Sequence, residues 1–530
     1  MDRKTLIAIA LSLVVLIGYP YLMRYINPQQ PKEQQARTGV ERGAGVSAVS
    51  TEGAPAPVEP GAPAPESGKK VKAELMTVET PLFKAVFSNQ GAGIESWELK
   101  DYSETIEKGS KGINLASSIA VNDSFATRLV SNGTAETLVF TLPRATTVEK
   151  GETTELVFLA RTSAGLNVIK KYTVTGDSFI VKTDLSIVNT SKSAFQGDVV
   201  TSLASNVAGK DKTGYHQGPV IDSQDGLKRQ YEKEARLEGQ QMRWIGIENK
   251  YFLAALYPLT EVPMGWSTQV PSAKSSSVSL RVPLDMPPGT ATNFSYNTFL
   301  GPKEYDLLVR QKLRLEESIQ FGMFAFMAKP MLVALNFFQR FLGNYGLAII
   351  LITIVIKIIF YPLSRHSLKS MKEMQKLQPQ LAAIKEKYKD DKEKMNKELM
   401  EMYKRYKVNP VGGCLPMVLQ IPVFIALYEV LYVAIELRHA PLFLWIRDLS
   451  DKDPYYITPL LMGGTMFLQQ KMTPSTMDPT QSKMMMFMPL IFTYMFLKFP
   501  SGLVLYWLLN NILTIAQQYY IQRSPSTAKA

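Results

Sequence analysis

The sequence contains very few residues that could bind a metal or form a disulfide. Cys414 is the only cysteine among 530 residues, and only three histidines are present. A single cysteine excludes an intrachain disulfide, and no CxxC or Cys/His spacing indicates a zinc site. A P-loop and the common nucleophile motifs are also missing. We therefore expect no catalytic residue, no metal and no cofactor, and we interpret the chain as a protein that is not an enzyme.

The charge is strongly positive, with a formal net charge of +12. The basic residues cluster beside apolar runs, which is typical of the cytoplasmic loops of membrane proteins rather than of nucleic-acid binding. We therefore expect no specific nucleic-acid partner beyond contact with a ribosome. Thirteen basic residues mark one segment as cytoplasmic: Arg365, Lys369, Lys372, Lys376, Lys385, Lys387, Lys389, Lys392, Lys394, Lys397, Lys404, Arg405 and Lys407.

The chain begins with two segments that are not expected to form a folded domain. Residues 1–24 combine a short basic start with an apolar run, and no A-x-A cleavage site follows. They are predicted to be an uncleaved signal anchor with a cytoplasmic N-terminus. Residues 25–70 contain the stretch APAPVEPGAPAPE and are too rich in proline, alanine and glycine to bury a core, so we interpret them as a linker.

Residues 71–300 contain short runs in which apolar and polar residues alternate, such as FIVKTDLSIVN. Period two with β-branched residues predicts strands, and turn signals at 89–91, 131–133 and 287–289 favour an antiparallel β-sandwich outside the cytoplasm. His216 has no metal-binding spacing around it and is expected to be a surface or packing residue. Asp222 and Asp225 could sit in a carbohydrate-type cleft, but we interpret them as loop acids.

Two helical segments are expected to lie outside the bilayer core. Residues 301–341 are charged and then aromatic, and Lys329-Pro330 interrupts the apolar part, so an interfacial amphipathic helix is predicted. Residues 364–408 are predicted to form a cytoplasmic helical hairpin whose basic outer face could contact a ribosome or acidic lipid headgroups. Its two apolar seams are Met374, Leu377, Leu381, Ile384 and Tyr388, and Met395, Leu399, Met402 and Tyr406.

The remaining segment, 342–522, contains five predicted spans, at 346–362, 415–435, 457–470, 484–499 and 503–519. With the anchor they give six spans and place both termini, including a short tail at 523–530, in the cytoplasm. The predicted fold is therefore a polytopic α-helical membrane protein with a five-span core and a large external β-sandwich. Lipid is its surrounding solvent.

One lysine lies within the first of the five core spans. Lys357 is about 7 Å from the inner end, where an ammonium group costs a few kcal/mol unless it meets water or a partner. A lysine that extends its charge to the interface is one interpretation. Other polar side chains lie at the same depth: Thr353, Gln420, Tyr506, Asn510 and Thr514.

The polar side chains at the depth of Lys357 have two interpretations. The side chains could hold the helices together through hydrogen bonds worth about 0.6 kcal/mol each. They could instead line a hydrated cavity that opens toward the cytoplasm, which we favour because a cation and several polar groups share one depth. A cavity that is open only to the cytoplasm would be a groove and not a pore. Six methionines near its entrance offer a soft surface: Met472, Met477, Met484, Met485, Met486 and Met488.

The core resembles the bacterial YidC membrane-protein insertases in four stretches: NPVGGCLPMVLQIPVFIALY (409–428), ELRHAPLFLWIRDLSDKDPYYI (436–457), FLQQKM (467–472) and FPSGLVLYW (499–507). The resemblance implies a hydrophilic groove, a periplasmic β-supersandwich and location in the bacterial inner membrane. The implied partners are nascent membrane proteins, the ribosome, the lipid bilayer and the Sec translocon. Lys357 replaces the usual arginine of the groove, Trp507 replaces a usual tyrosine, and Glu429 replaces an apolar or aromatic residue.

Two other classes of protein stay open at this point. An ion-coupled secondary transporter needs an internal repeat and paired ion ligands near the middle of the membrane, and Glu429 is the only deep acidic residue in these spans. A membrane-anchored carbohydrate-active enzyme needs two neighbouring carboxylates within the sandwich.

Overall fold

The computed structural model describes residues 72–119, 124–206, 208–211, 214–231, 236–260, 262–272, 275–389, 391–406, 415–472 and 479–523. The predicted anchor at 1–24, the linker at 25–70, Cys414 and Met477 lie outside these residues, as does the predicted tail beyond Arg523.

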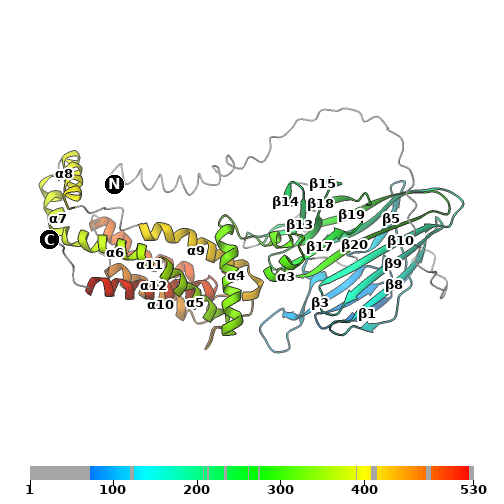
Figure 1. Ribbon diagram of the computed structural model, residues 1–530, viewed down its shortest axis with the longest axis horizontal. Coiled ribbons are helices and arrows are strands. Elements are labelled where there is room, and N and C mark those ends of the chain that lie inside the picture. Colours follow the sequence, from blue (N-terminus) through cyan, green and yellow to red (C-terminus); the bar gives the residue numbers. More distant parts are fainter. Residues whose placement is uncertain are drawn as a thin grey trace. The chain divides into compact units, whose positions relative to one another are not determined.

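The first half of the described chain forms three sheets (Figure 1). The five-stranded sheet has the order β4 (Gly112–Asn114), β3 (Ile94–Ser103), β2 (Phe83–Ser88), β1 (Leu75–Glu79) and β7 (Thr146–Thr147), and a short helix, α2 (Leu115–Ser118), follows β4. The six-stranded sheet has the order β15 (Arg236–Gly239), β18 (Gly265–Ser272), β19 (Ser275–Met286), β11 (Phe195–Ser205), β5 (Thr127–Ser131) and β6 (Thr134–Thr137).

The nine-stranded sheet is the largest. Its order is β12 (Gly209–Lys210), β13 (His216–Ser223), β16 (Trp244–Glu248), β17 (Phe252–Pro258), β20 (Ala291–Pro302), β10 (Ile180–Asn189), β9 (Leu166–Thr175) and β8 (Thr153–Arg161), and β14 (Gly226–Arg229) pairs with β13. Neighbouring strands along this order run antiparallel. The predicted β-sandwich is confirmed.

The alternation of side chains between the two faces of a strand determines which of them enter the core. Along β10, Val181, Thr183, Leu185 and Ile187 are buried, while the residues between them are more exposed. A turn signal also has a clear structural role. Asn132 and Gly133 have φ values of 50° and 76° and join β5 to β6, which is the tight hairpin turn that this pair of residues favours.

The sandwich buries a small network of charges. Glu248 is fully buried and accepts hydrogen bonds from Lys303 and Arg229, each at 2.6 Å, and Lys303 also donates to the Ser318 carbonyl at 3.1 Å. Burial lowers the pKa of Lys303 to about 8. Burial alone would raise the pKa of Glu248, but the charges of Lys303 and Arg229 outweigh it and lower that pKa. The network joins the end of β20 to the segment that leads into the helices.

The polar residues of the sandwich that were considered from the sequence, His216, Asp222 and Asp225, have structural contacts. His216 is buried and its Nε2 lies 3.0 Å from the Pro219 carbonyl. Asp222 is not the loop acid that we expected, because it lies in β13 with its carboxylate fully buried and paired with Arg243 at 2.6 Å. Asp225 is exposed and pairs with Lys228. Because Asp222 lies on a strand, its side chain is buried, and a buried carboxylate needs a partner such as Arg243.

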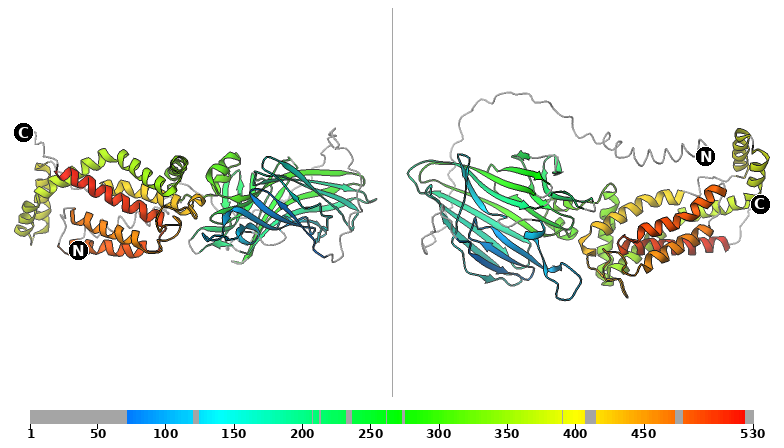
Figure 2. Two further views of the ribbon diagram at one scale, coloured as in Figure 1. Left: turned by 90° about the horizontal axis from the view of Figure 1, so that it is seen from below. Right: turned by 180° about the vertical axis from the view of Figure 1, so that it is seen from behind.

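The second half is helical (Figure 2). Its elements are α3 (Tyr305–Arg310), η1 (Leu315–Ser318), α4 (Ala325–Leu342), α5 (Tyr345–Ile359), α6 (Tyr361–Lys376), α7 (Gln378–Lys387), α8 (Lys392–Arg405), α9 (Leu415–Val433), η3 (Ile435–Leu437), α10 (Ile457–Met472), α11 (Pro479–Phe496) and α12 (Ser501–Arg523). Helix α12, drawn red, packs against α5, α6, α9 and α10. It therefore connects most of the helical half.

Within the described residues, no single helix is both long enough and apolar enough to cross a membrane by itself. The consecutive helices α5 and α6 meet both conditions together, with a bend of 63° between them. The bend falls at Phe360, directly before Tyr361 and Pro362, where proline starts a new helix in its first turn.

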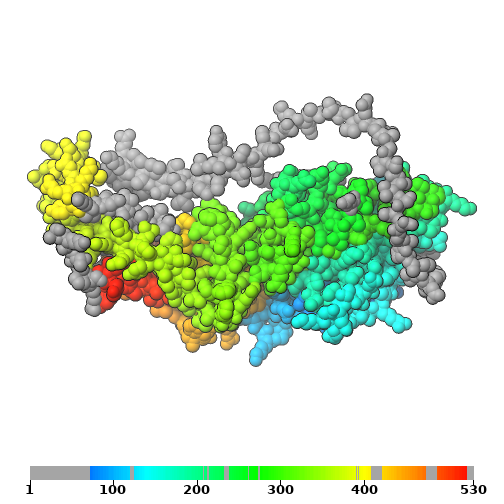
Figure 3. All heavy atoms as spheres, in the orientation of Figure 1, coloured from blue at the N-terminus to red at the C-terminus, as the bar shows by residue number. Residues whose placement is uncertain are grey.

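Helix α4 is apolar on two faces. Leu332 and Leu335 are buried against the other helices, whereas Phe326, Phe337 and Phe341 are more than half exposed. The polar ends of Lys329 and Arg340 reach carboxylates of the preceding segment, Glu317 and Asp306. Helices α7 and α8 form a separate pair whose small core contains Leu377, Leu381 and Met402, and Figure 3 shows them in yellow at the end of the helical half.

The buried network predicts a large difference between two charge removals. Glu248→Gln leaves the ammonium of Lys303 buried without a carboxylate and should lower the free energy of unfolding by about 3 kcal/mol. Glu79→Gln, which breaks the exposed 2.9 Å pair with Lys100, should leave it almost unchanged. Urea denaturation followed by tryptophan fluorescence measures both. Equal effects would contradict a special role for the buried pair.

Candidate functional site

Lys357 on α5 contacts a neutral group on α12. Its Nζ donates to the Thr514 hydroxyl at 2.7 Å, and Thr514 donates in turn to the Asn510 carbonyl at 2.7 Å. The lysine side chain is half-buried. No carboxylate among the described residues forms an ion pair with it. Its charge is therefore stabilised by a hydroxyl and is not cancelled.

A second bond joins α9 to the same face of α12. Gln420 Nε2 donates to Asn510 Oδ1. Asn510 and Thr514 are four residues apart, so their side chains lie on one face of α12, one turn from each other. The structure thus brings together Lys357, Gln420, Asn510 and Thr514, which we call the polar cluster.

The other polar residues of α12 have a different role. Asn511 is buried and its Nδ2 lies 3.3 Å from the Thr465 hydroxyl on α10. Gln518 Nε2 donates to the Met472 carbonyl at 2.9 Å, also on α10. These bonds tie α12 to α10, whereas the polar cluster joins α12 to α5 and α9. The interpretation as interhelical hydrogen bonds therefore fits this face of α12.

The remaining predicted site residues lie beside the polar cluster or apart from it. Tyr506 is buried, its ring stacks on Phe424 with 6.4 Å between centroids, and its hydroxyl has Gln420 as a polar neighbour. Thr353 is buried and donates to the Ile349 carbonyl of its own helix at 2.6 Å. Trp507 packs with its edge on Phe424 at 4.6 Å. Thr353 therefore bonds its own helix and Trp507 packs on an aromatic ring, so neither is counted in the polar cluster.

Two buried polar atoms near this region lack a hydrogen-bond partner among the residues that the structure describes. They are the Tyr506 hydroxyl and Gln517 Nε2. Buried polar groups are nearly always satisfied, so these atoms are expected to bind water or a ligand group. Of the methionines near the entrance, Met486 is 54% exposed and Met488 is 38% exposed.

Glu429 does not pair with Lys357. Its Oε2 accepts a hydrogen bond from the Tyr215 hydroxyl of the sandwich at 2.9 Å, near the opposite end of α9 from Gln420. Sequence reasoning missed Tyr215 as well as Lys250, whose Nζ lies 3.8 Å from the Tyr432 ring centroid. The one available signal was that an acidic residue in an apolar run requires a partner.

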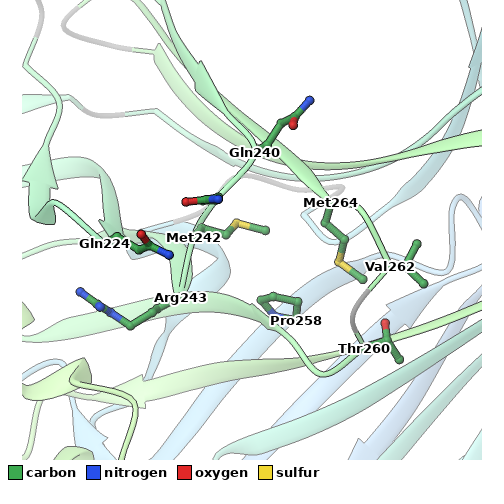
Figure 4. Close-up of a pocket in the computed structure, with 9 residues that line it drawn as sticks. Gln224, Gln240, Met242, Arg243, Pro258, Thr260, Val262 and Met264 are labelled. Atoms are coloured by element: carbon green, nitrogen blue, oxygen red, sulfur yellow. The ribbon is translucent and has the colours of Figure 1, made fainter. Parts of the chain in front are cut away.

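The sandwich contains a pocket with a volume of about 300 Å³ (Figure 4). Its described lining consists of amides, thioethers, small apolar groups and one guanidinium: Gln224, Gln240, Gln241, Met242, Arg243, Pro258, Thr260, Val262 and Met264. None of these nine residues carries a carboxylate, whereas glycoside hydrolysis uses two. The carbohydrate-active enzyme therefore gains no support from this part of the structure.

Two protein families match the chain over most of its length. The family described as "60Kd inner membrane protein" matches residues 337–528, and the family described as "YidC periplasmic domain" matches residues 75–334. The boundary between the two matches falls within α4, where the sandwich and its connecting segment give way to the helices.

Similar proteins match almost from end to end. "Membrane protein insertase YidC" of Syntrophus aciditrophicus is 42% identical and covers 99% of this chain and 100% of its own length. The protein of that name from Geobacter sulfurreducens is 46% identical, over 85% of this chain and 87% of its own. A solved structure, "Active YidC insertase crystal structure with the first transmembrane domain resolved", aligns with a TM-score of 0.39 and 20% identity over 85% of this chain and 93% of that one. As its sequence motifs predicted, the chain belongs to the YidC family of membrane protein insertases.

Proposed function

We propose that this chain inserts nascent membrane proteins into the bacterial inner membrane by receiving their polar ends at the polar cluster. The observation that carries the proposal is the bond from Lys357 to Thr514. It places a cation, with no carboxylate partner among the described residues, between the otherwise largely apolar α5 and the polar residues of α12. A charge in such a place is expensive, and functional sites are where it is retained.

The polar cluster acts by shortening the apolar distance that a polar tail must cross. Gln517 Nε2, which is buried without a hydrogen-bond partner among the described residues, supports the presence of water near this level. A cation beside that water attracts an acidic tail while the tail is still hydrated. No covalent step is involved. Translocation of the tail is assisted by the electric field of the lysine and by polar groups that replace hydrocarbon along its path.

Release of the substrate span is driven by the hydrophobic effect. The outward face of α11 is strongly apolar, with Phe487, Leu490, Ile491 and Tyr494 each at least 60% exposed. A substrate span that leaves the polar cluster along such faces enters lipid, and burial of its apolar surface gains roughly 25 cal/mol per Å². An insertase therefore needs polar groups at its inner level and apolar groups on its sides.

The proposed topology has six spans, namely the anchor, α5, α9, α10, α11 and α12. Both termini are cytoplasmic and the sandwich is periplasmic, with α4 lying in the interface through Phe326, Phe337 and Phe341. The basic pair α7–α8 then reaches into the cytoplasm, where it can contact a ribosome or acidic lipids. The Sec translocon is a further proposed partner. The four residues of the polar cluster, with Tyr506 beside them, form the proposed substrate groove.

The charge of Lys357 should matter more than its shape. Lys357→Arg keeps the cation and should insert substrates at nearly the parent rate. Lys357→Met keeps the length, removes the charge and should slow the translocation of acidic tails about tenfold, and Lys357→Glu should slow it further through repulsion. The measurement is reconstituted insertion of a single-span substrate with either an acidic or a neutral tail. If Lys357→Met handles both tails like the parent, Lys357 is only an interfacial anchor.

Water should reach one face of α12 but not the other. In a Cys414→Ser background, Asn510→Cys and Thr514→Cys should react with a membrane-impermeant thiol reagent added from the cytoplasmic side, because both positions belong to the polar cluster. Asn511→Cys is the matched control, since Asn511 is buried against α10 and should react at least about tenfold more slowly. Equal labelling of all three, or none, would support the interpretation as interhelical bonds alone.

A further inference from the structure

Glu429 is held by a residue that lies 214 positions earlier in the chain. Tyr215 donates to its Oε2 at 2.9 Å. On the other side of the carboxylate lies Gly322, at φ +63°, where an added Cβ would come within 2.8 Å of Glu429 Oε1. The acidic group is therefore enclosed by the sandwich and by the segment that precedes α4. A carboxylate in this position is held in one place by its surroundings.

Tyr215 is itself fixed from several directions. Its ring stacks on Tyr432 of α9 with centroids 5.5 Å apart. Lys250 lies over both rings, with its Nζ 3.8 Å from the Tyr432 centroid and 5.6 Å from that of Tyr215. The Tyr215 backbone N–H donates to the Asp211 carboxylate at 3.0 Å. Cation–π and stacking contacts of this kind add to the hydrogen bond and set the direction of the hydroxyl.

The contact continues along α9 as a series of rings. Tyr432 stacks on Tyr428 at 5.4 Å, and Tyr428 lies 6.4 Å from Phe424. Phe424 then contacts Tyr506 and Trp507 on α12. These residues are four apart on α9, so they share one face, and the next position on that face is Gln420 of the polar cluster. Glu429 and Gln420 are separated by about 13 Å along the helix axis.

We propose that the Tyr215–Glu429 contact is a clamp through which the β-sandwich sets the position of α9 against α12, and thereby the opening of the polar cluster. A packed helix moves as a rigid element, so a displacement at one end is transmitted to the other. Tyr215 and Glu429 are positioning residues in this scheme, because neither belongs to the polar cluster. Its consequence for insertion rests on the proposed function, but the clamp itself does not.

Other contacts keep the sandwich in place when the clamp is broken. Glu436 accepts from the Tyr305 backbone N–H at 3.2 Å, and Arg438 donates to the carbonyls of Ser103 and Glu104 at 2.8 and 3.1 Å. Glu436 and Arg438 both lie just after the C-terminal end of α9. Removing only the Tyr215 hydroxyl should therefore release α9 without separating the two halves of the protein.

The test measures the distance between α9 and α12 in the full chain. Spin labels are attached to Ile421→Cys and Ile512→Cys in a Cys414→Ser background, because both isoleucines are about half exposed and lie outside the polar cluster. Pulsed electron paramagnetic resonance then gives the distance distribution. Tyr215→Phe and Glu429→Gln should each shift or broaden it by about 2 Å. The double variant should change it no more than the larger single change, since both act on one contact.

The matched control is Tyr257→Phe, which also removes one tyrosine hydroxyl from the sandwich. Tyr257 accepts a hydrogen bond from Asn297 at 3.0 Å within the sheet and should leave the distance unchanged. A general loss of stability would affect both tyrosine variants alike. An unaltered distribution in Tyr215→Phe, or equal changes in both tyrosine variants, would overturn the clamp. Such a failure would leave the proposed function standing, since that is tested by insertion and by thiol labelling.

Discussion

Most features of the helical half depend on one constraint, which is the cost of a polar group that has no partner in an apolar surrounding. Polar side chains of α12 are accordingly bonded to α5, α9 and α10 rather than directed into lipid. This requirement makes α12 the helix that the others pack around. Next to the polar cluster, the rings of Phe424 and Trp507 pack against each other.

Lys303 of the sandwich and Lys357 of the helical half have different partners. Lys303 of the sandwich is paired with Glu248, and a second cation, Arg229, completes the network. Among the described residues, the hydrogen-bond partner of Lys357 is the hydroxyl of Thr514. A paired charge has its field largely cancelled and serves the architecture, whereas an uncancelled charge can act on another molecule. The lack of a carboxylate does not by itself mark a functional lysine, because Lys170 of the sandwich is fully buried and donates to the carbonyls of Gly91, Ala92 and Phe125.

The sequence could predict the β-sandwich because period two and turn residues are local signals, as at Asn132-Gly133. It could also place Lys357, Gln420, Asn510 and Thr514 at one level, because depth follows from position along a span. It could not give the direction in which each side chain points around its helix. At Thr353, for example, the depth was predictable, whereas the bond from its hydroxyl to the Ile349 carbonyl of its own helix was not.

Long-range partners were beyond the reach of the sequence for a different reason. The apolar run around Glu429 indicated that a partner was needed, but nothing local identified Tyr215. The prediction that Asp222 is a loop acid was wrong because nothing local identified its partner Arg243, which lies 21 residues away along the chain. Tertiary contacts decided both cases.

The weakness of the bonds in the polar cluster suits a site that must open. Each interhelical hydrogen bond is worth about 0.6 kcal/mol in a membrane, so the two bonds from Lys357 and Gln420 together contribute roughly 1.2 kcal/mol. An incoming polar tail can replace them at little cost, because it offers equivalent acceptors. The bonds of Asn511 and Gln518 to α10 and the stacked rings on α9 are not disturbed by that exchange. In the proposed function, the bonds of the polar cluster are exchanged for bonds to the substrate, while the bonds from α12 to α10 keep the bundle together.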